Sequence, residues 1–146
     1  PGSTAGVSIV ASYISTPDVG SNAITQTIEY ANDAILSILT ANETEVGNIV
    51  ITTQGGPMLI TGKIETGATA PNVLTYTLRI RRGTDATGTE LDRSKITSGG
   101  GNPMVVMCQK IDSQPAGTYT YKLWAHQSGA NADVAYRRLQ ALELKR

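Results

Sequence analysis

Residues 73–82, VLTYTLRIRR, contain the clearest structural signal in the chain. Every second side chain in this stretch is apolar, and these side chains share one face of an extended chain: Leu74, Tyr76, Leu78 and Ile80. The opposite face carries threonine and arginine. A period of two is that of a β-strand, so the stretch predicts a strand with one face in a hydrophobic core and a polar face outside it.

Stretches of the same kind lie on both sides of it and are separated by clusters of glycine, proline, asparagine and aspartate. They predict further strands at residues 47–53, 58–65, 104–111, 117–127 and 133–145. Short strands at regular intervals are typical of antiparallel sandwiches and barrels. The expected fold class is therefore all-β, an antiparallel β-sandwich or jelly roll.

The residues between the strands predict the connections. Residues 54–57, QGGP, indicate a tight turn, so the strands at 47–53 and 58–65 are expected to form a hairpin. Residues 83–102 are polar and rich in glycine and threonine, which predicts a long exposed loop with a short strand near residues 89–95. Loops of this length often have functional or interfacial roles.

Two segments leave alternatives open. Residues 24–39 have apolar side chains at near-helical spacing, but residues 34–39 would also serve as a strand, and we favour the strand. Residues 133–145 have apolar side chains on both faces, which indicates a bulge or burial against a neighbouring molecule. The pattern of this second segment also allows a helix.

The length of 146 residues suits one domain. We expect the sandwich to occupy residues 23–146 and an extended N-terminal arm to occupy residues 1–22. The serine and threonine content of this arm suits a segment that becomes ordered against a partner.

The charge of the chain is low and balanced. Twelve basic and twelve acidic side chains give a formal net charge of zero, and charged residues make up 16% of the chain, against roughly 25% in typical soluble domains. A neutral chain has no long-range attraction to nucleic acid or to an anionic membrane, so neither partner is expected. Such a domain stays soluble through uncharged polar side chains or buries surface against other subunits, and we favour subunit contacts.

Residues that commonly carry catalysis are scarce. His126 is the single histidine and so the one conventional base for a catalytic triad, and we expect it to be a surface or interface side chain instead. With one histidine and one cysteine, Cys108, the chain cannot build an ordinary zinc or iron site by itself. Asp85, Glu90 and Asp92 lie close together in the predicted loop, but their spacing fits no known calcium-binding loop. We therefore expect a non-enzymatic protein without metal or cofactor. A carbohydrate-active enzyme that relies on one or more of these acids, Asp85, Glu90 or Asp92, is the alternative.

The apolar strand faces outnumber those that one isolated sandwich can cover. Residues 104–111 place apolar side chains on both sides of their strand, so this strand needs cover on both. An outward row of arginines further suggests ion pairs with another subunit. The candidate interface residues are Val105, Met107, Trp124, Arg79, Arg81, Arg137 and Leu139.

Three stretches resemble jelly-roll domains in structural proteins of tailed bacteriophages. They are ITTQGGPMLITGKIE at residues 51–65, LTYTLRIRRGTDATGTEL at 74–91 and AGTYTYKLWAHQSGANADVAYRRLQALELK at 116–145. Among such proteins, the capsid decoration (cement) proteins are most similar in size. The resemblance implies a homo-oligomer, commonly a trimer, which binds the major capsid protein on the outer surface of the virion after synthesis in the host cytoplasm.

The same resemblance allows a second role. Tail, fibre and receptor-binding domains of phages use similar jelly rolls, so the chain could instead be an adhesin that binds a host glycan or protein through residues 83–102. In the decoration reading, residues 1–22 correspond to the arm with which such proteins grip their neighbours.

Overall fold

The computed structural model describes residues 26–38, 42–67, 74–98, 102–129 and 132–144. These residues form nine strands and no helix. In chain order the strands are β1 (Gln26–Asn32), β2 (Leu36–Ile38), β3 (Thr44–Thr53), β4 (Pro57–Thr66), β5 (Leu74–Arg82), β6 (Thr89–Ser98), β7 (Val105–Ser113), β8 (Gly117–Ser128) and β9 (Ala132–Glu143). The expected all-β class is confirmed.

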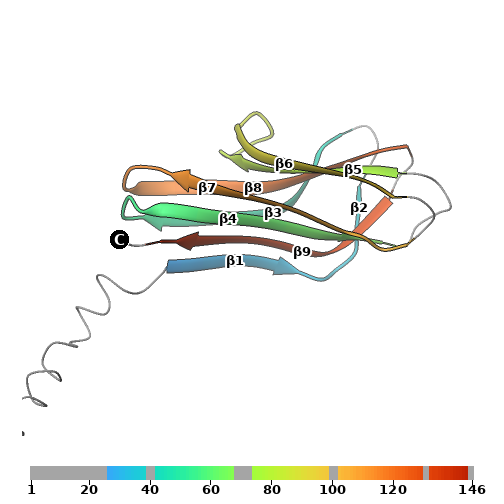
Figure 1. Cartoon of the computed structure of the whole chain (residues 1–146), viewed down its shortest axis with the longest axis horizontal. Helices are drawn as coiled ribbons and strands as arrows, with labels where there is room; N and C mark the ends of the chain where they lie inside the picture. The colour runs from blue at the N-terminus through green and yellow to red at the C-terminus, as the bar shows by residue number, and fades with distance from the viewer. Residues whose placement is uncertain (1–25, 39–41, 68–73, 99–101, 130–131, 145–146) are drawn as a thin grey trace, which may run out of the picture.

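The strands form two antiparallel sheets that pack as a sandwich (Figure 1). We call the sheet with the order β1-β9-β4-β7 sheet A, in which β2 also pairs with β9. Sheet B has the order β3-β8-β5-β6. Among the described strands, only β5 and β6 are both hydrogen-bonded to each other and consecutive in the chain. β1 and β2 both pair with β9, and every other connection passes from one sheet to the other, so most of the pairing is long-range.

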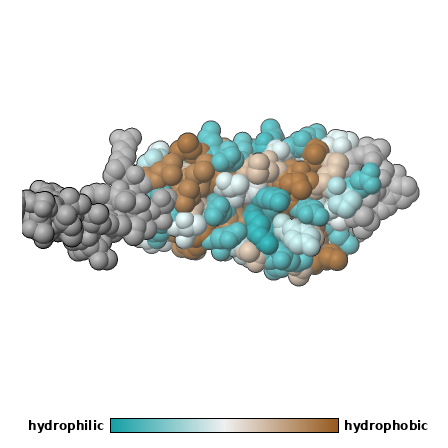
Figure 2. All heavy atoms as spheres, turned by 60° about the horizontal axis from the view of Figure 1, so that its bottom comes forward, coloured by the Kyte–Doolittle hydropathy of each residue, from teal (hydrophilic) through white to brown (hydrophobic). Residues whose placement is uncertain are grey.

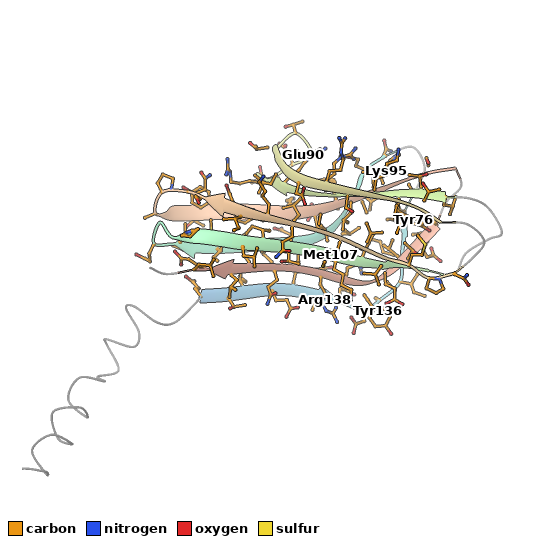
Figure 3. The ribbon with its side chains drawn as sticks, in the orientation of Figure 1. Tyr76, Glu90, Lys95, Met107, Tyr136 and Arg138 are labelled. Carbon is orange, nitrogen blue, oxygen red and sulfur yellow. The ribbon has the colours of Figure 1, made fainter. Side chains whose placement is uncertain are left out.

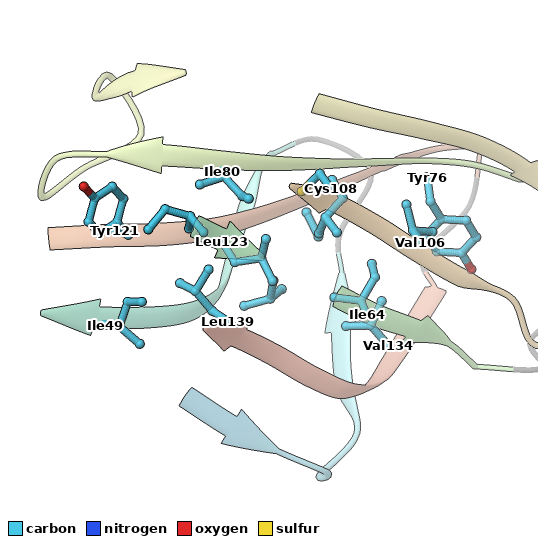
Figure 4. Packing of buried hydrophobic residues seen from close by; sticks show 14 of the residues in the cluster. Ile49, Ile64, Tyr76, Ile80, Val106, Cys108, Tyr121, Leu123, Val134 and Leu139 are labelled. Atoms are coloured by element: carbon cyan, nitrogen blue, oxygen red, sulfur yellow. The ribbon is translucent and has the colours of Figure 1, made fainter. Parts of the chain in front are cut away.

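The inward faces of the two sheets form one hydrophobic core (Figure 4). The strand predicted from residues 73–82 is β5, and the four apolar side chains of its inward face are all buried, as predicted. Tyr121 and Leu123 of β8 meet them from the same sheet, while Ile64 and Leu139 approach from sheet A. The alternation along each strand therefore reports correctly which side chains are inside.

The predicted hairpin at residues 47–65 is wrong. β3 pairs with β8 in sheet B, whereas β4 pairs with β7 and β9 in sheet A, so the turn between them crosses from one sheet to the other. The buried carboxylate of Glu143 organises this turn: its Oε1 accepts hydrogen bonds from the Thr53 hydroxyl at 2.5 Å and from the backbone N–H of Gln54 at 2.8 Å and Gly56 at 3.2 Å. Turn residues alone predict the bend and not which sheet each strand joins.

The predicted long loop at residues 83–102 is also wrong in its extent. β6 is a ten-residue strand that pairs with β5 along its length, and residues 83–88 form the short connection between them. Gly83 has a φ of 135°, which glycine adopts without strain. β6 has few apolar residues because it is an edge strand with little core to cover, so its sequence resembles a loop.

Both ambiguous segments are strands. Residues 26–32 and 36–38 pair with β9 at different positions along it. The expected bulge in β9 is confirmed, because the register with β4 shifts between Lys63 and Glu65, opposite Tyr136. Tyr136 has a φ of 46°, a left-handed conformation that bulky side chains rarely adopt. The N-terminal arm expected at residues 1–22 lies outside the described residues.

Candidate docking surface on sheet A

The structure divides the predicted interface residues among three places. Val105 and Met107 project from the outer face of sheet A on β7, with exposed fractions of 50% and 55%. Trp124, Arg79 and Arg81 lie partly buried on the outer face of sheet B, where β8 and β5 pair. The remaining two residues, on β9, are buried. The seven residues therefore do not form one surface.

Arg137 and Leu139 belong to the interior rather than to an exposed interface. Leu139 is fully buried in the core, and the guanidinium Nη2 of Arg137 donates a hydrogen bond to the backbone oxygen of Ala34 at 3.1 Å. This bond attaches the turn between β1 and β2 to β9. The bulge at Tyr136 shifts the alternation of β9, which is why apolar residues occur on both faces of its sequence pattern.

The arginines on sheet B have acidic partners within the chain. The carboxylate of Glu43 forms ion pairs with both Arg79 and Arg81, and Glu90 approaches the same two guanidinium groups at 3.1 and 3.8 Å. Burial lowers the pKa of Arg79 despite the favourable charge of Glu90. No second subunit is needed to neutralise this arginine row.

Lys122 and Trp124 extend the charged cluster toward β3. The ammonium group of Lys122 lies 2.6 Å from Glu45 and 5.9 Å from the centre of the Trp124 ring. This geometry is that of a cation–π contact. The outer face of sheet B is thus largely occupied by contacts within the chain.

The candidate catalytic residues are dispersed, and each acid has a local role. The Asp85 side chain accepts hydrogen bonds from Thr87, chiefly from its hydroxyl, which lowers the pKa of Asp85. Glu90 pairs with arginines, and Asp92 accepts a hydrogen bond from the backbone N–H of Gln109. In the described part of the chain, no three histidine, cysteine or acidic residues are grouped so that they could hold a metal ion.

Cys108 lies in the core and has the properties of an unreactive thiol. Burial, with a smaller contribution from Asp92, raises its pKa to about 12. Cys108 is therefore a structural residue of the core. His126 lies partly buried on the outward side of β8. Across the described ranges, no helix is long and apolar enough to span a membrane.

A buried polar cluster that the sequence analysis missed joins the two sheets at one end of the sandwich. Asp112 of β7 accepts hydrogen bonds from Arg82 of β5 at 2.7 and 2.8 Å, from the Tyr121 hydroxyl at 2.8 Å and from Gln114 at 2.9 Å. Burial disfavours the Asp112 carboxylate, but these donors outweigh burial and lower the pKa of Asp112. Burial, and then the hydrogen bond to Asp112, raise the pKa of Tyr121. The cluster is structural, since it joins β7 of sheet A to β5 and β8 of sheet B.

Exposed apolar side chains concentrate on the sheet A side of the molecule. Of the seven large hydrophobic side chains that are exposed among the described residues, six belong to sheet A or to the turn between β1 and β2: Ile35, Val105, Met107, Ile111, Tyr136 and Leu144. Figure 2, which turns the β1 side of the molecule forward, shows apolar patches alternating with hydrophilic ones. Singly exposed hydrophobic residues need no explanation, but a concentration on one sheet marks an interaction surface.

The strand register arranges the outer face of sheet A in rows across β7, β4 and β9. One row is entirely apolar and consists of Ile111, Leu59 and Leu142. Leu144 follows directly beyond β9, and we call these four residues the apolar row. Two rows further along the strands contain both charged and apolar residues, and we call them the mixed rows. One consists of Met107, Lys63 and Arg138, and the other of Val105, Glu65 and Ala135, with the bulged Tyr136 next to Ala135.

Of this surface, Val105 and Met107 were predicted from the sequence as interface residues, whereas the apolar row and the mixed rows were not. Leu59, Lys63 and Glu65 alternate with the buried residues of β4, so the strand pattern already indicates that they face outward. What the pattern does not reveal is their neighbours, because the register between β4, β7 and β9 joins residues far apart in the sequence.

No protein-family model and no curated protein matches the sequence. Solved structures with a similar fold include the infectious bursal disease virus VP2 subviral particle, with a TM-score of 0.59, 12% identity, and coverage of 86% of this chain and 34% of that chain. The T13 particle of the same virus gives a TM-score of 0.58 at 10% identity, covering 85% of this chain and 32% of that one. This chain thus spans about a third of the length of the virus chains.

The Eiger TNF from S. frugiperda has a TM-score of 0.57 at 10% identity, and the match covers 82% of this chain and 92% of the TNF chain. Identities this low establish the fold and nothing finer. The chain therefore has a β-sandwich fold that occurs both in chains of virus particles and in a TNF.

Proposed function

We propose that this chain is a non-enzymatic structural protein of a virus particle, and specifically a decoration protein that binds the outer surface of a phage head and stabilises it. The similarity of its fold to chains of icosahedral virus particles supports a structural role. The resemblance of three stretches to phage jelly-roll proteins favours the decoration role. The dispersed acids and the unreactive Cys108 are what a protein without catalysis would have.

The single observation that carries this proposal is the apolar row. Ile111 is 57% exposed, and it lies beside Leu59 and Leu142 at one end of the outer face of sheet A. Complete burial of one such side chain is favourable by about 1.5–3 kcal/mol, so a partner that covers the row gains several kcal/mol. In the proposed function, that partner is the major capsid protein.

The position of the apolar row also brings it close to the start of β1. Gln26 pairs with Glu143, and Thr27 pairs with Leu142 of the row, so the chain that precedes Gln26 joins the domain at this end. An arm at residues 1–22, as the resemblance implies, would add its own contacts with the shell to those of the apolar row. A combined contact of this kind would hold the shell through two covalently linked elements.

Stabilisation of the head then follows from mass action. A protein that binds the assembled shell and not its free subunits lowers the free energy of the shell by its own binding free energy, once for each copy bound. The same binding raises the barrier to rupture. Assembly of this chain into a homo-oligomer would multiply the contacts further.

Co-sedimentation with purified heads of the encoding phage, stripped of this protein, tests the proposal. Ile111→Glu places a charge in the apolar row and should weaken binding at least about tenfold, because a charge buried without a partner is costly. Val50→Glu is the matched control, since Val50 is 50% exposed on the edge strand β3 of sheet B and should bind normally when changed.

Deletion of residues 2–22 is the second arm of the test and should abolish binding to heads. Equal head occupancy by the intact chain, Ile111→Glu and the deletion variant would overturn the proposed function.

A further inference from the structure

The central charges of sheet A are unlike those of sheet B. Lys63 and Glu65 are half-buried at neighbouring outward positions of β4. Among the described residues, neither takes part in an ion pair, whereas Arg79, Arg81 and Lys122 on sheet B all do. A half-buried charge is more stable with an opposite charge nearby. The outer face of sheet A thus presents one cation and one anion that form no ion pair with each other or with another described residue.

The strands on either side of β4 also carry a pair of side chains in the rows of Lys63 and Glu65. On β7, Met107 pairs with Lys63 and Val105 pairs with Glu65, so an apolar residue accompanies each charge. On β9, Arg138 pairs with Lys63, and the bulged Tyr136 directly follows Ala135, the partner of Glu65. Figure 3 shows Arg138 and Tyr136 side by side. Each strand therefore holds, at two adjacent outward positions, two groups that attract one another: two apolar side chains, a cation and an anion, or a cation and an aromatic ring.

A surface in which each group finds its complement two residues further along the same strand is complementary to itself. Consider a two-fold axis in the plane of the contact, perpendicular to the strands and midway between the row of Lys63 and the row of Glu65. This axis places the Lys63 row of one copy over the Glu65 row of the other. All three pairs then meet at once, each of them twice. An isologous contact requires this kind of self-complementarity.

We propose that a second copy of this chain packs on this half of the outer face of sheet A, with Lys63 of each copy facing Glu65 of the other. Two sheets stack face to face about 10 Å apart, a distance that lysine and glutamate side chains can bridge. In this contact Met107 meets Val105, and the Arg138 guanidinium meets the Tyr136 ring. Asp33 already fixes Arg138 through an ion pair of 2.6 Å, which leaves the planar face of the guanidinium available for stacking.

The conformation of Tyr136 is a second argument for a contact with another copy. Its left-handed backbone is strained for a tyrosine, and the bulge directs the side chain outward, so that it is 49% exposed. A bulge that re-aims a side chain is typically found where that side chain has a task. In the proposed contact, the exposed ring of Tyr136 packs against the Arg138 guanidinium of the second copy.

The inference deepens the proposed function, on which it rests for the reason why copies associate, and it assigns the two halves of one face to two partners. The mixed half binds a second copy, and the apolar row remains available for the shell. An isologous contact joins copies two at a time, so it predicts an assembly with an even number of copies, in place of the trimer that the resemblance implies.

Charge exchange tests this inference in solution with the full chain. Light scattering coupled to size exclusion, and analytical ultracentrifugation, measure the mass and the dissociation constant. Lys63→Glu and Glu65→Lys should each weaken association at least about tenfold. In the first variant a glutamate faces a glutamate across the contact, and in the second a lysine faces a lysine. The double variant should associate like the unaltered chain.

Mixing the two single variants gives the sharpest result. In the mixed pair, the glutamate introduced at position 63 of one variant faces the lysine introduced at position 65 of the other, and the unaltered Glu65 faces the unaltered Lys63. An equimolar mixture should therefore recover association that neither variant shows alone. Lys95→Glu is the control, since Lys95 is exposed on β6 and Figure 3 places it on the opposite side from Tyr136 and Arg138. That change should leave the mass unaltered.

The outcomes that overturn the inference are distinct. An unaltered chain that stays monomeric or forms a strict trimer excludes the two-fold contact, and so does a mixture that remains dissociated. Circular dichroism and the melting temperature of each variant report folding, and Met107→Ser offers an uncharged change at the same contact. Head binding is measured separately through Ile111→Glu, so the failure of this inference and the failure of the proposed function give different results.

Discussion

Asp92 of β6 accepts a hydrogen bond from the backbone N–H of Gln109 in β7, with 2.8 Å between Oδ2 and N. The bond joins an edge strand of sheet B to an edge strand of sheet A. It also occupies a backbone donor on the free edge of β7, which would otherwise be available to pair with a strand of another chain. A side-chain acceptor at this position disfavours association through the edge of β7.

Replacing Asp92 by alanine should therefore expose the edge of β7. We expect a loss of about 1–2 kcal/mol in the free energy of unfolding, because the Gln109 N–H loses its acceptor, together with slow aggregation at high concentration. Asp92→Asn keeps an acceptor oxygen and is the matched control. Urea denaturation and dynamic light scattering measure the two effects. Aggregation of both variants at equal rates would contradict this role of Asp92.

Asp112 should make stability dependent on acid. The pKa of Asp112 is lowered in the folded chain, so its contribution to stability is complete above the unfolded value of about 3.9 and is lost as the pH falls through the folded pKa. Asp112→Asn should cost about 2–4 kcal/mol at pH 7 and should flatten the decline in melting temperature below pH 4. Melting curves at pH 7 and pH 3 measure both. An unchanged acid profile would show that other carboxylates dominate.

Glu143 should be needed for the crossing between β3 and β4. Its carboxylate accepts three hydrogen bonds from residues 53–56, so Glu143→Ala should remove about 3 kcal/mol from the free energy of unfolding. Gln140→Ala is the control, because Gln140 is exposed on the same strand. Denaturant titration distinguishes them. Equal stability of the two variants would mean that the turn forms without Glu143.

Cys108 should react slowly with thiol reagents in the folded chain. Its pKa of about 12 keeps the thiolate scarce at pH 8, and its burial excludes the reagent. We expect alkylation at least about 100-fold slower than in the chain unfolded by urea, as measured by mass spectrometry. Rapid alkylation without denaturant would indicate that β7 detaches readily from the sandwich.

The features that the sequence predicted best are those that depend on one strand at a time. Tyr76 and its apolar neighbours on β5 are buried because alternation is a local property. Val105 and Met107, predicted as interface residues, are exposed on β7, whose other face is in the core. Trp124 is partly buried, since Lys122 and the neighbouring strands cover the face on which it lies.

The features that it missed depend on residues far apart in the chain. The turn at residues 54–57 was mistaken for a hairpin because its organising carboxylate, Glu143, lies about 90 positions later. Arg79 was assigned to a partner subunit because Glu43, 36 positions earlier, gives no local sign of pairing with it. Leu139 was placed at an interface because one bulged residue reversed the apparent face of β9.

Hydrogen–deuterium exchange of the chain bound to heads, compared with the free chain, tests the central claim most directly, since it reports which face meets the shell. The account predicts slower exchange at Ile111 on β7, at Leu59 on β4 and around Leu142 on β9, with sheet B unchanged. Protection centred instead on Arg79 and Trp124 of sheet B, with sheet A exchanging as in the free chain, would contradict it.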